Sequence, residues 1–422
     1  MKDETKCLHS GYKPQNGGPG VMPIYQSTTF RFDSTDEIAQ VFDDPTKAHI
    51  YSRFTNPTVD CVEKKIADLE GGVAAMCTTS GQAASLISIL NIASAGDRIL
   101  STSAIYGGTV NLFAVTMKKF GITVDFIDVD ATDEEIEKMI QPNTKAIFGE
   151  TLTNPSLQVL DIEKFAKVAH SNDIPLIIDN TFPTPILCKP IEFGADIVIH
   201  STTKYMDGHA LQVGGVIVDS GKFNWVNGKF PEFTEVDDSY HGMIYTRDYP
   251  ACPYIIKARA QLMRDFGCYP SGMSGFLLNL GLETLALRME RYCQNGLKLA
   301  KFFESHPKIE AVNYPGLENN KYHTLAKKYL PKGTSGVMSI TIKGGKSEAI
   351  KFMDKLQMAS KEVHVADIRT CVLHPASATH RQLTDEQLVA CGINPGMVRV
   401  SCGLENIEDI IKDFEQALNW FN

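Results

Sequence analysis

A lysine and an aspartate each follow a short apolar stretch of this chain, and both side chains can take part in covalent chemistry. Residues 197–200 lead through three hydroxyl side chains to Lys204, and residues 175–178 end at Asp179. Both stretches have the length and composition of short buried strands. Because open α/β sheets bind ligands at the carboxyl ends of their strands, we expect the amine and the carboxylate to meet at one edge.

An amine and a carboxylate at one sheet edge suit an enzyme that uses pyridoxal 5'-phosphate. The lysine can form a Schiff base with the cofactor aldehyde, and the aspartate can keep the pyridine nitrogen protonated. The ordinary interpretation of a single lysine is an exposed surface residue. The run His200-Ser201-Thr202-Thr203-Lys204-Tyr205 favours the cofactor, because it resembles the lysine signature of the Cys/Met-metabolism family of fold-type I pyridoxal-phosphate enzymes.

The resemblance assigns the cofactor phosphate to a second segment. Residues 73–76 read as a short strand that leads into Ser80, Gly81 and Gln82, after which a helical pattern begins. This arrangement presents free backbone N–H groups to an anion, although a serine that only caps the helix gives the same pattern. We assign the side chains that follow two other strands to the same cofactor: Thr181, Ser201 and Thr203.

The resemblance also implies that a neighbouring subunit completes the phosphate site. Tyr51 and Arg53 match the Y-x-R motif of the family, and the planar guanidinium of arginine can bind phosphate oxygens in pairs. A loop closed by the turn at Asn56-Pro57 is the structural alternative. The match implies an active unit of at least two chains, and we expect a homotetramer made of two such dimers.

Two loops that follow strands match residues around the cofactor ring. Tyr106, beside paired glycines, matches the tyrosine that stacks on the pyridine ring, and we count it as catalytic together with Lys204 and Asp179. Asn154 matches the residue that approaches both the cofactor and the substrate. We interpret Glu150, in the same turn, as structural.

Arginines near the end of the chain concern the substrate. Arg399 lies in an apolar strand, where its charge is unfavourable unless an anion meets it, and it matches the family arginine that binds the substrate α-carboxylate. Arg369 is better interpreted as a partner of nearby carboxylates. His241, in a long loop, could contact the substrate or cap the loop, and we favour capping.

The long segment 220–253 and the run 374–383 resemble the O-acetylhomoserine sulfhydrylases within the family. We therefore expect γ-replacement on O-acetyl-L-homoserine by sulfide or a small thiol, which gives homocysteine or methionine plus acetate. The alternative is γ-elimination of the kind that methionine and cystathionine γ-lyases perform. Two segments depart from the family pattern. Residues 207–210 are Asp-Gly-His-Ala where the family usually has Gly-Gly-His-Gly, and residues 364–367 are His-Val-Ala-Asp where it usually has Asn-Val-Gly-Asp.

Short strands alternate with helical segments over the first part of the chain, which predicts an α/β fold with a mostly parallel sheet. Strands are expected at 98–102, 124–127, 146–149, 176–179, 197–200 and 213–218. The resemblance implies fold type I, with an arm (1–60), a large cofactor-binding domain (61–265) that contains a seven-stranded sheet, and a smaller α+β domain (266–422). We also expect helices at 256–266, 276–288 and 297–305, and a half-exposed strand at 337–342.

Composition limits the partners of the chain. A net charge of −9 without a basic stripe argues against nucleic acid and anionic membranes. The ten cysteines form no C-x-x-C pair, and the charged start lacks an apolar signal region, so we expect a cytoplasmic protein. His374 and His380 lack further ligands, and we predict no metal site.

Overall fold

The structure, a computed structural model, describes residues 1–44, 46–379, 381 and 394–420. Its larger sheet has seven strands in the order β1-β7-β6-β5-β4-β2-β3. Only β7 runs antiparallel to its neighbours, which confirms the predicted mostly parallel sheet. The strands are β1 Ala74–Thr78, β2 Arg98–Thr102, β3 Thr123–Ile127, β4 Thr144–Glu150, β5 Leu176–Asp179, β6 Ile197–His200 and β7 Gly215–Asp219.

Helices pack on the strands of this sheet and bury their side chains, which explains why the strand sequences are almost continuously apolar. Helices α3 (Pro57–Glu70) and α4 (Gly81–Leu90) contact β1 and β7, and α7 (Ile162–Ser171) contacts β4 and β5. The neighbouring strands β5 and β6 pair in parallel, with Asp179 opposite Ile199. The segments that carry Asp179 and Lys204 therefore leave the sheet at the same edge.

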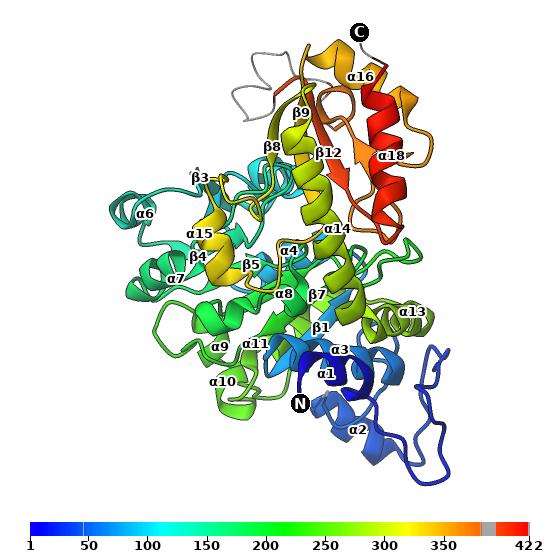
Figure 1. The fold of residues 1–422 in the computed structure, drawn as a ribbon. Helices are drawn as coiled ribbons and strands as arrows, with labels where there is room; N and C mark the ends of the chain where they lie inside the picture. Colours follow the sequence, from blue (N-terminus) through cyan, green and yellow to red (C-terminus); the bar gives the residue numbers. More distant parts are fainter. Residues whose placement is uncertain (45, 380, 382–393, 421–422) are drawn as a thin grey trace.

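A second sheet of five strands, in the order β10-β11-β12-β9-β8, lies above the first in Figure 1. Its strands are β8 Ile309–Asn313, β9 Val337–Ile342, β10 Ser360–Lys361, β11 Cys371–Leu373 and β12 Met397–Ser401. The prediction that β9 is half-exposed is wrong, because every one of its residues is buried. Ser339 pairs with Arg399 of β12 and with Asn313 of β8, and the polar side chains of Ser339 and Thr341 are both buried.

Each sheet has its own hydrophobic core, and helix α14 (Leu285–Ser305) contributes to both. Its first half packs Leu285 and Met289 into the larger core, and its second half packs Leu299 and Phe303 into the smaller one. Figure 1 shows this helix running alongside both sheets. The domain boundaries at residues 60 and 265 stay a prediction.

The predicted helices before α14 differ from the observed ones in detail. The segment expected at 256–266 is helical but contains a π-helical stretch, η4 (Ala258–Met263), between α11 (Pro253–Lys257) and α12 (Arg264–Phe266). The helix expected at 276–288 is broken at Thr284, where α13 (Gly272–Glu283) ends and α14 begins.

The long segment 220–253 packs on the large sheet through aromatic side chains. It contains only two short helices, α9 (Pro231–Thr234) and α10 (Tyr245–Asp248). Trp225 is buried and stacks on Phe233, with ring centroids 4.5 Å apart, and on Tyr254 of α11 at 5.2 Å. This aromatic cluster holds the segment in place without regular secondary structure.

The remaining elements connect or flank the two sheets, and no described helix has the length and apolar character that a membrane crossing requires. They are α1 Asp3–His9, α2 Thr35–Asp43, α5 Gly107–Asn111, η1 Leu112–Thr116, η2 Met117–Phe120, α6 Asp133–Met139, α8 Thr184–Leu187, η3 Pro190–Phe193, α15 His323–Tyr329, α16 Lys346–Lys355, η5 Pro375–Ser377 and α18 Ile407–Leu418. The chain between α1 and α3 forms an arm that extends from the lower edge of the body in Figure 1.

Candidate active site

A cavity of about 430 Å³ opens where the carboxyl edge of the large sheet faces the small sheet. Its volume is typical of small-molecule sites. All predicted site residues except Tyr51 and Arg53 line it: Ser80, Gly81, Gln82, Tyr106, Asn154, Asp179, Thr181, Ser201, Thr203, Lys204 and Arg399. The structure thus brings together residues that are separated by more than three hundred positions in the sequence, from Ser80 to Arg399.

One end of the cavity is formed by the start of helix α4. Ser80 caps this helix, since its hydroxyl accepts a hydrogen bond from the N–H of Ala83 at 3.0 Å. A Cβ on Gly81 would lie 2.6 Å from the Cβ of Ser201, so only glycine allows the two loops to approach so closely. The Oε1 atom of Gln82 is buried and has no hydrogen-bond partner. The free backbone N–H groups at the helix start suit an anionic group, whereas the Gln82 oxygen is an acceptor that lacks a donor.

Asp179 lies in the wall of the cavity at the end of β5. Its Oδ1 accepts hydrogen bonds from the backbone N–H and the hydroxyl of Thr181. Burial raises the pKa of Asp179, while the bonds from Thr181 and the nearby His200 act in the opposite direction. Glu150 is its partner across the strands, and burial together with Asp179 raises the pKa of Glu150 well above its usual range. Of the two carboxyls, Glu150 is therefore the one whose pKa is raised more strongly.

Glu150 also ties two loops of the cavity together. Its carboxyl oxygens accept hydrogen bonds from the backbone N–H of Tyr106 at 2.6 Å and of Asn154 at 3.1 Å. These bonds fix the loops that carry the predicted ring-stacking and substrate-contacting side chains. Glu150 lines the cavity as well, next to Asp179.

Lys204 and Arg399 are two cations that line the same cavity. Burial and the neighbouring Arg399 lower the pKa of Lys204 to about 8, so a large part of the amine is neutral at mildly alkaline pH. Burial lowers the pKa of Arg399 to about 10. Among the described residues, the guanidinium donates hydrogen bonds to the neutral oxygens of Asn154, Val363 and His364, at 3.0 to 3.2 Å. A buried guanidinium with this environment favours an anionic ligand.

Tyr51 and Arg53 lie outside the cavity, on the arm. Both side chains are exposed, and the Arg53 guanidinium stands 5.3 Å from the centre of the Tyr51 ring. Arg53 also donates a hydrogen bond to the carbonyl of Arg264. Within one chain these two residues do not reach the other predicted cofactor residues.

The remaining polar predictions fall on ordinary contacts. Arg369 forms a two-pronged ion pair with Asp367 at 2.7 and 2.9 Å. His241 is on the surface, where its Nδ1 lies 3.2 Å from a carboxylate oxygen of Asp43. His374 contacts Ser377 and the carbonyl of Pro395. His380, the second histidine of the weighed metal pair, lies outside the described residues.

The departing segment 207–210 contacts the residues that directly follow the other departing segment, 364–367. Ile368 donates a backbone hydrogen bond to Gly208 at 2.8 Å, and Arg369 donates to the carbonyl of His209 at 3.1 Å. Ala210 and Ala366, which replace the glycines of the pattern, have φ angles of 56° and 64°. Both alanines therefore adopt the left-handed conformation that favours glycine.

Among the cavity residues that sequence reasoning missed, His364 lies next to Lys204. Its Nδ1 lies 3.4 Å from the Nζ of Lys204, and its neighbours Val363 and Val365 also line the cavity. The only signal in the sequence was the departure at residues 364–367, which carried no indication that the new side chain would face the lysine.

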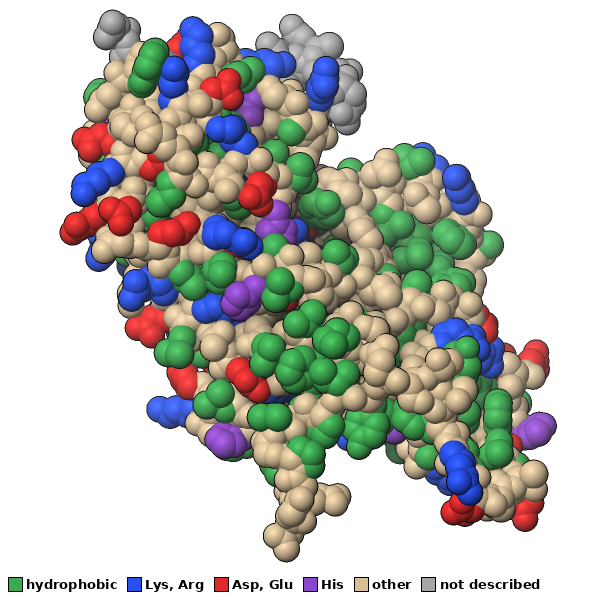
Figure 2. Space-filling view, turned by 90° about the vertical axis from the view of Figure 1, so that its right-hand side faces the viewer, with side chains coloured by type: hydrophobic (Ala, Val, Ile, Leu, Met, Phe, Trp, Pro, Cys, Tyr) green, Lys and Arg blue, Asp and Glu red, His purple; other side chains and the backbone are tan. Residues whose placement is uncertain are grey.

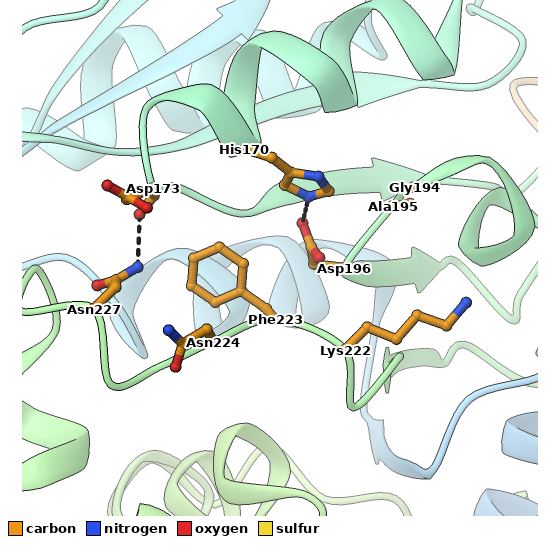
Figure 3. A pocket seen from close by; sticks show the side chains of 9 residues that line it. All are labelled: His170, Asp173, Gly194, Ala195, Asp196, Lys222, Phe223, Asn224 and Asn227. Atoms are coloured by element: carbon orange, nitrogen blue, oxygen red, sulfur yellow. Dashed lines mark hydrogen bonds and ion pairs between the residues drawn. The ribbon is translucent and has the colours of Figure 1, made fainter.

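A second hollow, of about 250 Å³, lies near the opposite edge of the large sheet. Figure 3 shows Phe223 between two polar pairs, in which His170 bonds to Asp196 and Asn227 bonds to the carbonyl of Asp173. None of the side-chain atoms around it is buried without a partner. The buried polar side-chain atoms of this hollow thus have partners, in contrast to Oε1 of Gln82 in the cavity.

Comparison with known proteins agrees with the geometry of the cavity. Residues 4–419 match the family described as Cys/Met metabolism PLP-dependent enzyme. The chain belongs to this family. An O-acetyl-L-homoserine sulfhydrylase of Leptospira meyeri is 45% identical to it, and the match covers 99% of this chain and 97% of the relative. A homocysteine synthase of Schizosaccharomyces pombe is also 45% identical, over 98% and 97% of the two chains.

The fold of this family member is likewise shared by a solved structure. A crystal structure from Campylobacter jejuni, described as an O-acetylhomoserine (thiol)-lyase with N'-pyridoxyl-lysine-5'-monophosphate, superposes with a TM-score of 0.95. It is 38% identical, and the match covers 99% of this chain and 100% of that one. The likeness over both whole chains confirms the predicted fold class.

The side chains of the cavity fit pyridoxal phosphate, the cofactor of the family. Lys204 offers an amine whose lowered pKa makes it nucleophilic, as a Schiff base requires. Asp179 offers a carboxylate for the pyridine nitrogen, and the unpartnered Gln82 lies at the start of helix α4, where a phosphate group would find backbone donors.

Proposed function

We propose that this chain replaces the acetate group of O-acetyl-L-homoserine by sulfide or a small thiol and so produces homocysteine or methionine plus acetate. The main observation in support is that one cavity is lined by both Lys204 and Arg399. The pKa values of this amine and this guanidinium are lowered. The sulfhydrylase and synthase names of relatives that match the whole chain support the choice of substrate.

The cofactor would be held by residues that follow four strands. Ser80, Gly81 and Gln82 would surround its phosphate, and Ser201 and Thr203 would contribute hydroxyls. Lys204 would bind the aldehyde carbon, Asp179 with Thr181 would face the pyridine nitrogen, and Tyr106 would cover the ring. Bound pyridoxal phosphate supplies an electron sink for the electron pair that is left when a proton leaves the substrate α-carbon.

The substrate is oriented by its carboxylate. Arg399 binds the two carboxylate oxygens, and Asn154, which already accepts a hydrogen bond from Arg399 at 3.2 Å, contacts the same end of the molecule. Binding of the carboxylate in this way would direct the Cα–H bond toward Lys204. The Lys204 amine is free to act there once the substrate amine has replaced it at the cofactor. The amine then removes the proton from Cα and moves a proton at Cβ, which lets acetate leave from Cγ.

An assay panel separates replacement from elimination. O-acetyl-L-homoserine with sulfide should yield homocysteine, and methionine alone should yield no ketobutyrate. Formation of ketobutyrate from methionine alone would support a γ-lyase and contradict the proposal. Lys204→Ala should abolish both the product and the visible absorbance of the bound cofactor. Lys222→Ala, which changes a lysine of the second hollow, is the matched control and should keep both.

We further propose that two chains complete each site, through Tyr51 and Arg53 of the partner's arm. Three observations support this: both residues lie outside their own cavity, the arm exposes the apolar side chains Val21 and Tyr25, and it projects from the body. Figure 2, which views the side of the molecule where α13 and the arm lie in Figure 1, shows hydrophobic side chains gathered over its middle and lower part. A dimer would cover them. A tetramer of two such dimers and a cytoplasmic location remain predictions.

Mixing two inactive variants tests the shared site. Arg53→Ala and Lys204→Ala should each be nearly inactive alone. After co-refolding or subunit exchange, activity should return to roughly one quarter of the wild-type value, because half of the random dimers contain one intact site out of two. Arg31→Ala, which changes another exposed arginine of the arm, should stay active alone. Mixtures that stay inactive, although size-exclusion chromatography shows mixed dimers, would contradict the shared site.

A further inference from the structure

His364 contacts the amine of Lys204 and has no part in the roles assigned so far. Its Nδ1 lies 3.4 Å from Nζ, within hydrogen-bond reach. Its other ring nitrogen, Nε2, is buried and has no hydrogen-bond partner, and the nearest carboxylate oxygen, Oδ2 of Asp367, lies 3.7 Å away. The imidazole thus stands between a reacting amine and a carboxylate.

The carboxylate end of this series reaches the surface. Asp367 is itself buried, but it is paired at 2.7 and 2.9 Å with Arg369, whose side chain is 59% exposed. The groups Lys204, His364, Asp367 and Arg369 therefore lead from the interior of the cavity to solvent.

The loop that carries His364 is fixed by contacts with the substrate-binding strand. Arg399 of β12 donates to the carbonyl of His364 at 3.1 Å, and Cys371 lies 3.4 Å from the same oxygen. Ser401 of β12 accepts a hydrogen bond from the N–H of Ala366 at 2.8 Å. These contacts hold the imidazole in a defined place beside the lysine rather than leaving it on a free loop.

The proposed reaction produces a proton inside this cavity. When sulfur enters as hydrogen sulfide or a neutral thiol, an S–H bond and the Cγ–O bond break, an S–Cγ bond forms, and acetate leaves as an anion. One proton per turnover is left over. Thiols are mostly protonated at neutral pH, since their ordinary pKa is near 8.5. The amine of Lys204 accepts the proton of the thiol, and this proton must then leave the cavity.

We propose that His364 is a proton-transfer residue that carries this proton from Lys204 toward Asp367. In the step, an N–H bond of the Lys204 ammonium breaks and an N–H bond forms at Nδ1 of His364. The proton on Nε2 then passes to Asp367 and to solvent, which leaves a neutral imidazole with its proton on Nδ1. Rotation of the ring or proton exchange with solvent returns this proton to Nε2 before the next turnover. The inference rests on the proposed function, because it takes its proton from the replacement reaction.

Several charged groups face His364 and set its protonation. Burial and Lys204 lower the pKa of His364, whereas Asp367, Glu362 and Asp207 act in the opposite direction. With a lowered pKa, His364 is mostly neutral, so it can accept a proton and releases it again readily.

Substitution of His364 tests the transfer step. His364→Asn, which restores the residue of the family pattern, should lower kcat roughly 100-fold with a neutral thiol as donor, with little change in KM for the ester. The deficit with sulfide should shrink as pH rises, because the donor then arrives as an anion. Added imidazole should restore kcat in His364→Gly. His323→Asn is the matched control, since His323 also has a buried, unpartnered Nε2 but lies away from the cavity.

A spectroscopic readout decides the contact itself. In the full-length chain with ¹⁵N-labelled histidine, the pKa of His364 should rise in Lys204→Ala and fall in Asp367→Asn, measured with and without added pyridoxal phosphate. The proposal is wrong if the pKa of His364 changes in neither variant. It is also wrong if added imidazole does not restore kcat in His364→Gly. If the wild-type enzyme makes no homocysteine, the replacement function fails instead, and the histidine titration still reports on the contact.

Discussion

Lys204 and Arg399 share one cavity, and each positive charge opposes the ionisation of the other. Burial is the larger cause of the low pKa of Lys204, and Arg399 is the second. A lysine with a pKa of about 8 is part neutral under working conditions, whereas an ordinary lysine is almost fully charged. The arginine thus has two effects, since it attracts the substrate carboxylate and favours the reactive form of the lysine.

Replacing Arg399 with glutamine should change both properties. The pKa of Lys204 should rise above 8, because a like charge has been removed, so the neutral fraction at pH 8 falls. KM for the ester should rise roughly 10- to 100-fold, as expected for the loss of charge-assisted hydrogen bonds. The pH dependence of Lys204 labelling by an amine-reactive reagent, read by mass spectrometry, checks the first effect. Arg247→Gln, a surface arginine paired with Asp248, is the control, and an equal shift there would contradict the explanation.

At the residue level the sequence predicted most of the cavity lining. Lysine, aspartate and hydroxyl side chains at strand ends are visible as breaks in apolar runs, and the family pattern supplied Asn154 and Arg399. Their assignment to individual roles stays a prediction. His364 was not predictable, because a contact between residues 204 and 364 depends on how the small sheet meets the large one.

Among the elements, strands were predicted better than helices. Strands β2, β5 and β6 begin and end at the predicted residues, because buried parallel strands are short apolar runs with polar ends. The break at Thr284 was missed, since a helical pattern continues on both sides of it. The burial of β9 was missed because alternation of polar and apolar residues usually marks a solvent-exposed face, whereas Ser339 and Thr341 are buried here.

The two loops that depart from the family pattern contain strained backbone. Ala210 and Ala366 each adopt a left-handed conformation, which costs an alanine roughly 1 to 2 kcal/mol relative to the right-handed region. Glycine relieves this strain, but it adds about 0.4 to 1 kcal/mol of entropy cost through the unfolded chain. The balance favours glycine.

Ala366→Gly and Ala210→Gly should therefore each raise the free energy of unfolding by up to about 1 kcal/mol. The same exchange at Ala349, inside helix α16, should lower it by about 1 kcal/mol, because glycine is a poor helix former. Urea unfolding followed by circular dichroism distinguishes the two signs. A loss of stability at both loop positions would show that the strain is compensated by contacts of the alanine methyl groups.

For the molecule as a whole, buried carboxyls make stability depend on pH. Burial raises the pKa of Asp219, at the end of β7, to about 7, and its Oδ2 has no hydrogen-bond partner. The folded state binds a proton here between pH 4 and 7 that the unfolded chain releases, so stability falls as pH rises through this window. The effect is up to about 4 kcal/mol, at 1.4 kcal/mol for each unit of pKa shift.

Asp219→Asn should remove this part of the pH dependence. The variant should gain stability relative to the wild type at pH 8 and gain much less at pH 4, where the folded carboxyl is protonated and the unfolded one is about half protonated. Unfolding curves in urea at the two pH values measure the difference. If the stability difference between the variant and the wild type is the same at both pH values, the pKa of Asp219 is not raised in the folded state. Asp133→Asn, at an exposed carboxylate, is the control.

The chain contains two tryptophans, and the fold gives them opposite surroundings. Trp225 is enclosed in the aromatic cluster of the segment 220–253, whereas Trp420 is 65% exposed at the far end of the chain, with the amine of Lys355 over its ring. Solvent already surrounds Trp420, so the shift of fluorescence emission on unfolding must come mainly from Trp225. The shift of intrinsic fluorescence therefore reports on unfolding around the large sheet. Trp225→Phe should remove most of this shift, and unfolding of the small sheet then has to be followed by another signal.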